Sequence, residues 1–311
     1  MVGDLPELAQ RSPERALELH AKLPKGDGQY GYGYSAAQSI FLVWAQTDPV
    51  GAAARAMQSL GKRQAALNIV SQLAEANPKA AAAFAMNLPA GAAQTSALSS
   101  VASSWAQNDP KAAAQWAVSL GTTDAPGNLL RSVAQGWAQN SPTEAAAWVA
   151  TLPVGAAQNN AALSIVSTWS HQDPAGAAAW VGAFPEGQTR DSAISSVVSG
   201  WTQNDPQGAS KWLESLPAGK SRDKAAETFL NQASYQEPAL AARWALELYA
   251  SAGNQPGQVN RNTYQIENVA RNWMNVDERA ARAWIAQAPL SEEKKKALLN
   301  ANRKPEVELK R

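Results

Sequence analysis

Residues 140–171 decide the fold of this chain and read NSPTEAAAWVATLPVGAAQNNAALSIVSTWSH. The next stretch, residues 172–203, reads QDPAGAAAWVGAFPEGQTRDSAISSVVSGWTQ and repeats the first after 32 residues. Both contain a proline, the run Ala-Ala-Ala-Trp-Val, a second proline, a glycine and a late tryptophan at the same positions. Self-similarity at a period of about 20–50 residues is typical of solenoids, propellers and other repeat arrays. The chain is therefore expected to consist of copies of one structural unit.

The 32-residue period extends over most of the 311 residues. Two tryptophan series and one proline series keep it: Trp105, Trp137, Trp169 and Trp201; Trp116, Trp148, Trp180, Trp212 and Trp244; Pro78, Pro110, Pro142, Pro174, Pro206 and Pro238. We count eight repeats and one partial repeat, with looser repeats at both ends, where a polar outer face is needed. We expect one solenoid domain over 1–311, divided into an atypical first repeat (1–46), core repeats (47–235), a repeat lengthened by a loop (236–275) and a C-terminal cap (276–311).

Each repeat is predicted to form two helices. A capping residue followed by proline opens the first helix at Asp109-Pro110, Ser141-Pro142, Asp173-Pro174 and Asp205-Pro206. The cap oxygen accepts an N–H that has no partner in the helix, and proline at the first position lacks such an N–H. With that proline as position 0, apolar residues at +3, +6, +7 and +10, and again at +20, +23, +24 and +27, form two helical stripes. The pattern predicts an all-α solenoid of about eight helix-turn-helix repeats plus a C-terminal partial repeat.

The repeated tryptophans are the predicted structural core. Small residues at +3 and +4, such as Ala145 and Ala146, let neighbouring helices approach, and the tryptophans fill the space between them. The core set is Trp116, Trp137, Trp148, Trp169, Trp180, Trp201 and Trp212. We expect Trp148 and Trp169, one from each helix of a repeat, to be largely buried. Because two short helices are not stable alone, each repeat must bury its apolar face on the next.

Residues 105–121 resemble a known repeat family and read WAQNDPKAAAQWAVSLG. This run resembles the junction between tetratricopeptide repeats: Asp109, Pro110, Ala113 and Trp116 match at that family's spacing, and the Leu-Gly pair follows one residue late. The chain departs from the family in its period of 32 rather than about 34 residues, in its early Leu-Pro stop and in its second helix ending in tryptophan. The resemblance implies a right-handed superhelix whose inner wall, formed by the first helices, binds a protein or peptide.

Composition excludes several functional classes. The chain has 27 basic and 26 acidic residues, so it lacks the basic footprint of a nucleic-acid binder. It has no cysteine, which excludes disulfides, thiolate metal sites and thiol catalysis. No stretch approaches 18 consecutive apolar residues, so membrane insertion is not expected. No signal peptide is recognised, and two locations stay open: the cytoplasm, or an exported state with the leader removed.

No catalytic pattern has the structural context that it needs. A GxGxxG match at Gly26, Gly28 and Gly31 would require a preceding strand, whereas the segment before it reads as a helix. The only histidines, His20 and His171, have no spacing that would build a metal site. The sequence therefore predicts a chain that is not an enzyme, with no catalytic residue, no metal and no cofactor.

Position +5 of the first helix is the main candidate for partner binding, because it lies beside the core stripe. It holds Gln115, Ala147, Ala179, Lys211 and Arg243 along successive repeats, and so changes from neutral to basic. If the first helices line the inner wall, as the resemblance implies, Gln115 would contact a neutral part of the partner. Lys211 and Arg243 would suit an acidic end or a free carboxylate. The alternative is that both cations are ordinary solvated charges, which contribute little.

A second candidate is the Gly/Tyr-rich insertion that carries Tyr30, Tyr32 and Tyr34. Tyrosines alternating with glycine could form an adaptable aromatic contact surface, as in antibody paratopes. The alternative is a loop that caps the open end of the solenoid.

These observations predict a non-catalytic scaffold that binds a protein or peptide partner in an extended groove lined by the first helix of each repeat. Two alternatives stay open. The chain could be a self-assembling structural protein whose neutral, alanine-rich faces pack on other copies, or the helical-repeat accessory domain of a larger protein.

Overall fold

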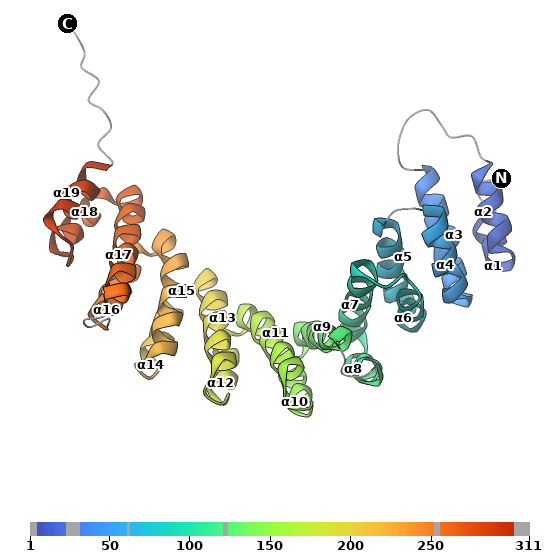
Figure 1. The fold of residues 1–311 in the computed structure, drawn as a ribbon, viewed down its shortest axis with the longest axis horizontal. Coiled ribbons are helices and arrows are strands. Elements are labelled where there is room, and N and C mark those ends of the chain that lie inside the picture. Colours follow the sequence, from blue (N-terminus) through green and yellow to red (C-terminus); the bar gives the residue numbers. More distant parts are fainter. Residues whose placement is uncertain (1–4, 23–31, 61–62, 121–123, 252–255, 302–311) are drawn as a thin grey trace, which may run out of the picture. The chain divides into compact units, whose positions relative to one another are not determined.

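The computed structural model describes residues 5–22, 32–60, 63–120, 124–251 and 256–301, and in this part of the chain it contains helices and no strand. Nineteen α-helices lie in the described ranges and follow one another as helix-turn-helix repeats (Figure 1). The predicted all-α solenoid is thereby confirmed. The chain divides into two compact units, residues 1–168 and 169–311, and each is described by itself. A single domain over 1–311 stays a prediction.

The first unit contains the atypical N-terminal repeat and the first core repeats. Its helices are α1 (Leu5–Arg11), α2 (Pro13–Ala21), α3 (Tyr32–Thr47), α4 (Pro49–Leu60), α5 (Arg63–Ala76), α6 (Pro78–Met86), α7 (Ala92–Asn108), α8 (Pro110–Ser119), α9 (Asp124–Asn140), α10 (Pro142–Ala150) and α11 (Ala156–Gln172), whose last residues belong to the second unit. Within this unit the second helices pack directly on one another, α5 on α7 and α7 on α9.

The second unit contains the remaining repeats. Its helices are α12 (Pro174–Gly182), α13 (Gln188–Asn204), α14 (Pro206–Ser215), α15 (Lys220–Gln236), α16 (Pro238–Ser251), α17 (Pro256–Val276), α18 (Glu278–Gln287) and α19 (Glu292–Ala301). Here α13 packs on α15 and α15 on α17. The lengthened repeat was expected to contain a loop near residues 251–260, of which residues 252–255 lie outside the described part of the chain. On either side, α16 and α17 have 14 and 21 residues, compared with 10 and 17 in α14 and α15.

Capping starts most first helices as predicted. The side chain of Asp109 accepts a hydrogen bond from the amide of Ala112 at 3.1 Å, and Asp173 and Asp205 bond the third helical residue in the same way. Ser141 was expected to do so as well, and this prediction is wrong, since its side chain makes no capping bond. The second helices α7, α13 and α15 each follow a glycine with φ of 143–150°, a conformation that side-chain-bearing residues rarely adopt.

The cap aspartate can also accept the indole N–H of the preceding tryptophan. Trp201 Nε1 donates to Asp205 Oδ2 at 3.3 Å, and Trp44 does the same to Asp48. The equivalent indole N–H of Trp137 is buried and has no partner, and there Ser141 stands in place of the aspartate. In these two repeats one aspartate therefore bonds to two helices, because it caps the first helix of its repeat and accepts a bond from the helix before it.

Removing Asp205 should destabilise the second unit more than removing a cap alone. We expect Asp205→Ala to lower the free energy of unfolding by about 2 kcal/mol, which combines the lost cap with the lost indole acceptor. Asp277→Ala is the matched control, because Asp277 caps α18 and accepts no indole N–H; it should cost about 1 kcal/mol. Urea denaturation of both variants measures the difference, and equal losses would show that the indole bond contributes nothing.

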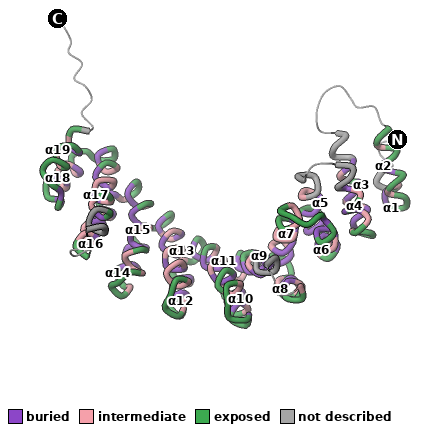
Figure 2. Tube along the Cα trace, viewed as in Figure 1, coloured by how far each residue is buried: buried purple, intermediate pink, exposed green. Residues whose placement is uncertain are grey.

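Burial follows the predicted stripes. Ala145 and Val149 of α10 and Ile165 and Val166 of α11 are buried, and the second helices repeat this pattern. Exposed positions concentrate on the first helices, such as α12 and α14 (Figure 2). The core therefore lies between the second helices and the side of each first helix that faces them. On their opposite side, the described first helices carry exposed residues.

The tryptophans divide into two classes, which the sequence did not predict. Trp105, Trp137 and Trp169 of the second helices are buried, at 5–7% exposure. Trp201 and the first-helix tryptophans Trp116, Trp148, Trp180 and Trp212 are only half-buried. The prediction that Trp169 is largely buried is confirmed, and Trp148 is less deeply buried than Trp169.

Each half-buried first-helix tryptophan packs against the tryptophan that ends the preceding second helix. The ring centroids lie 5.5–6.1 Å apart in the pairs Trp105–Trp116, Trp137–Trp148, Trp169–Trp180, Trp201–Trp212 and Trp273–Trp284. This spacing is favourable for aromatic pairs. In the pair Trp137–Trp148, Trp148 is left half-buried because it also borders an open groove between two first helices.

Candidate functional site

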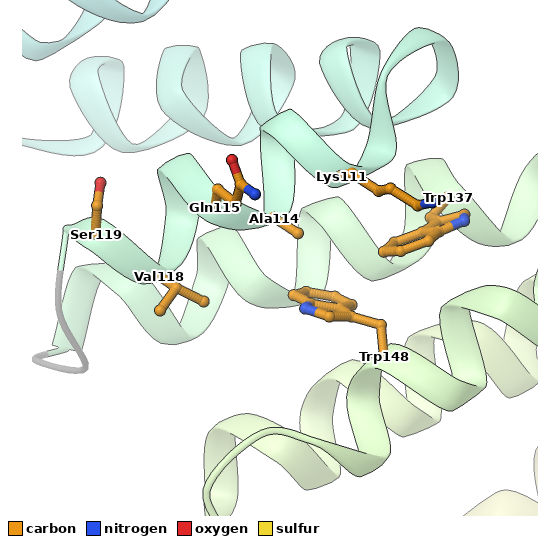
Figure 3. A pocket seen from close by; sticks show the side chains of 7 residues that line it. All are labelled: Lys111, Ala114, Gln115, Val118, Ser119, Trp137 and Trp148. Atoms are coloured by element: carbon orange, nitrogen blue, oxygen red, sulfur yellow. The ribbon is translucent and has the colours of Figure 1, made fainter.

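Consecutive first helices leave shallow grooves between them. In the first unit the α8–α10 groove has a volume of about 490 Å³ (Figure 3). Its lining residues are Lys111, Ala114, Gln115, Val118, Ser119, Trp137 and Trp148. In the second unit the α14–α16 groove has a volume of about 450 Å³, and its lining residues are Gln207, Ser210, Lys211, Glu214, Glu237, Ala239, Leu240 and Arg243.

The same helix positions build both grooves. Counted from the proline that opens the helix, positions +1, +4, +5 and +8 of α8 line one groove, and the same positions of α14 line the other. These positions recur at spacings of three and four residues, so they lie on one side of a helix. The grooves are therefore a property of the repeat, and their chemistry changes with the residues at these four positions.

All five candidate residues at position +5 are exposed: Gln115, Ala147, Ala179, Lys211 and Arg243. Gln115 lies in the α8–α10 groove, whereas Lys211 and Arg243 come together in the α14–α16 groove. These side chains lie beside the core stripe and outside the core, as predicted. Their role in binding stays a prediction.

The α8–α10 groove is mainly apolar. Val118 of α8 is 52% exposed, and it projects into the same groove as the half-buried ring of Trp148 from α10 (Figure 3). Trp137 packs on Trp148 with ring centroids 5.6 Å apart and closes one end. Lys111 extends toward that end, and none of the lining residues is a carboxylate. The groove thus offers an apolar surface with one cation beside it.

The α14–α16 groove has balanced charges. Arg243 Nη2 donates to the hydroxyl of Ser210 at 2.7 Å and forms an ion pair with Glu214. Lys211 forms no ion pair among the described residues, and Glu237 lines the groove on the side of α16. Arg243 therefore already has partners within the protein. Of the two cations expected to be available to a ligand, Lys211 remains, and the carboxylates of Glu214 and Glu237 line the same groove.

A cluster around the buried side chains of Trp244 and Ser210 adjoins the α14–α16 groove. The indole N–H of Trp244 donates to Ser210 Oγ at 2.8 Å, and the guanidinium of Arg222 lies 5.3 Å from the centre of the Trp244 ring. Arg222 also forms an ion pair with Glu247. Burial raises the pKa of the neighbouring Asp223 above its usual value, and this effect outweighs the attraction of Arg222. This cluster holds α14, α15 and α16 together.

The candidate tyrosines contribute no described side chain. Tyr30 lies outside the described residues. Tyr32 and Tyr34 belong to the start of α3, so this part of the expected Gly/Tyr-rich loop is helical. The GxGxxG match likewise lies outside the described residues.

Two features are absent from the part of the chain that the structure describes. No group of three or more His, Asp or Glu side chains there could hold a metal ion. No described helix combines the length and apolar character needed to cross a bilayer.

Sequence reasoning missed positions +1 and +8 as groove residues. The pattern was present in the sequence. Lys79 and Met86 of α6 lie one period before Lys111 and Val118 of α8, so both helices have a lysine at +1 and an apolar residue at +8. Met86 and Val118 were not recognised because a single apolar residue on a helix surface is common and needs no explanation. Only the packed α10, with Trp148 facing the groove, makes Val118 part of a larger apolar surface.

Comparison with known proteins finds no match to any family model, any curated protein or any solved structure. The similarity to tetratricopeptide repeats therefore rests on the junction residues 105–121 and on the helical-repeat architecture.

Proposed function

We propose that this chain is a non-catalytic scaffold that binds extended protein or peptide segments in the grooves between its first helices. The observation that carries the proposal is the α8–α10 groove, where the half-exposed Val118 and the half-buried Trp148 form one apolar surface. Tryptophan is one of the residue types that most often dominate the binding energy of protein interfaces once a partner covers them. A repeat array with such grooves supports a tetratricopeptide-like mode of binding.

The groove is suited to a segment of peptide rather than to a small molecule. It is open along α8 and α10, and side chains from the three helices α8, α9 and α10 line it. A ligand that lies along it can bury its own apolar side chains against Val118 and Trp148. Each buried apolar side chain contributes about 1.5–3 kcal/mol, and such contacts must together exceed the cost of immobilising the ligand.

The test is selection from a random dodecapeptide library displayed on phage, with the full chain immobilised. Val118→Ser should weaken binding of the selected peptides about tenfold, because it removes an apolar contact worth roughly 1.4 kcal/mol. Val154→Ser is the matched control, since Val154 is 95% exposed and lies outside the groove residues. Fluorescence anisotropy with labelled peptides gives the dissociation constants.

Failure to select any peptide, or equal effects of the two substitutions, would argue against groove binding. The alternative of self-assembly predicts a different result. In that case light scattering of the chain alone should show a mass that grows with concentration, and Val118→Ser should change the mass rather than peptide affinity.

A further inference from the structure

Two neighbouring first helices of the first unit each expose a lysine and an apolar side chain at the same two positions. Position +1 is Lys79 in α6 and Lys111 in α8, and position +8 is Met86 and Val118. All four side chains are exposed, and the two apolar ones are 44% and 52% accessible. A helix rises about 1.5 Å per residue, so the cation and the apolar side chain start about 10.5 Å apart along each helix.

These lysines have no charge partner within the described part of the protein, where no ion pair includes either of them. The carboxylate nearest in sequence to Lys111, that of Asp109, caps α8 through the amide of Ala112. On the other helix of the groove, Glu144 is exposed in the first turn of α10, but it does not line the groove. The α8–α10 groove therefore holds one cation and no carboxylate, unlike the balanced α14–α16 groove.

We propose that the α8–α10 groove takes an extended acidic peptide. The ligand places a carboxylate side chain beside Lys111 and an apolar side chain between Val118 and Trp148, and these two ligand residues are three positions apart. The spacing follows from geometry if the ligand adopts an extended polyproline II conformation, which has three residues per turn and rises about 3.1 Å per residue. Residues three positions apart then lie on the same side of the ligand and are about 9 Å apart, close to the roughly 10 Å between the two contacts. This inference rests on the proposed function, and it adds the charge and spacing of the ligand.

The two contacts have different roles. Burial of the apolar side chain against Val118 and Trp148 supplies most of the affinity, since it removes apolar surface from water. The contact with Lys111 is exposed to solvent, so it selects the ligand charge and speeds association. A repulsive charge at the same place disfavours the ligand, and this makes charge reversal at Lys111 the most sensitive test.

The experiment uses the full chain and three fluorescein-labelled dodecapeptide pools that differ at one fixed position. The pools carry Asp-x-x-Leu, Asn-x-x-Leu or Lys-x-x-Leu, with x drawn from Ser, Gly, Ala and Gln, and binding is measured by fluorescence anisotropy. The Asp pool should bind about fivefold more tightly than the Asn pool and more tightly still than the Lys pool. An Asp-Leu pool without the spacer should lose this advantage.

Lys111→Glu should weaken binding of the Asp pool about tenfold and should reverse the order of the Asp and Lys pools. Lys224→Glu is the matched control, because Lys224 is an exposed lysine of α15 that lines neither groove; it should leave the order unchanged. Both lysines lie on the surface, where substitutions rarely affect folding, and circular dichroism checks the helix content of each variant.

Each outcome decides between the proposals. If none of the pools binds the chain, this inference is wrong, and the peptide selection described above decides separately whether the proposed function is wrong as well. If all pools bind equally well, peptide binding stands and the acidic-ligand inference is overturned. A change of order with Lys224→Glu instead of Lys111→Glu would also overturn it, because the carboxylate would then be recognised outside the α8–α10 groove.

Discussion

Replacing Trp244 by alanine is expected to lower the free energy of unfolding by about 3–5 kcal/mol, the range for truncating a large aromatic side chain in a core. Trp244 is 1% exposed and is the largest fully buried side chain among the described residues. The substitution also removes the hydrogen bond to Ser210 Oγ and the ring beneath the guanidinium of Arg222. A buried hydroxyl and a cation would then each lose a favourable contact, which adds to the cost of the cavity.

Trp212→Ala is the matched control, because Trp212 occupies the same repeat position one period earlier and is only half-buried. It should cost about 2 kcal/mol, since its ring contacts Trp201 on one side and is partly solvated on the other. Urea denaturation followed by circular dichroism measures both variants. Equal losses would contradict the division of the tryptophans into buried and half-buried classes.

The damage from Trp244→Ala should also be local. In a repeat array each repeat contacts only its neighbours, so stability is lost first around the substituted repeat. Hydrogen exchange should therefore accelerate in α14–α17 and remain slow in α7–α9 of the first unit. Uniform acceleration in both regions would contradict nearest-neighbour coupling.

Gly136→Ala is the second substitution with a large expected effect, about 3 kcal/mol of lost stability. Gly136 lies in α9, where a Cβ atom would come within 2.2 Å of the carbonyl oxygen of Ser103 and 2.9 Å of its carbonyl carbon in α7. Both atoms belong to the backbone of a packed helix, so they cannot move aside as a flexible side chain would. The new methyl group must push α9 away from α7.

Gly182→Ala provides the control for this substitution. Gly182 is the last residue of α12, is exposed, and would place its new Cβ in open space. Alanine is the better helix former by about 1 kcal/mol, so this variant should be as stable as the original chain or slightly more stable. Thermal denaturation distinguishes the two glycines, and a similar small effect at both would show that α7 and α9 do not approach as closely as described.

Much of the fold could be predicted because its signals are local. The Asp-Pro pairs at residues 109–110, 173–174 and 205–206 start helices where expected, since capping and the fixed φ of proline act within one turn. The apolar stripes at Ile165 and Val166 face the core for the same reason, because helical periodicity sets which side is buried. The side chain of Ser141 makes no capping bond, although serine is a residue type that commonly caps helices.

The candidate binding residues were less predictable. The exposure of Lys211 and Arg243 follows from their place beside the stripe, but the ion pair between Arg243 and Glu214 joins residues 29 positions apart on α14 and α16. Lys111 did not stand out in the sequence, and it became a candidate only because α10 forms the other wall of its groove. Charge pairing and groove lining depend on distances between helices, which no local pattern contains.

The sequence by itself determined the class of fold, the period, the starts of most core helices and the apolar face of each helix. These features depend on interactions between residues close together in the sequence. Because the repeat recurs along the chain, each pattern could be recognised in several copies. Only the tertiary structure decided which tryptophans are buried. Trp244 is enclosed by Phe229, Arg222 and Ser210 from neighbouring helices, whereas Trp148 at the same repeat position borders an open groove. Burial is a property of what packs against a side chain, so identical positions in a repeat acquire different environments when their neighbours differ.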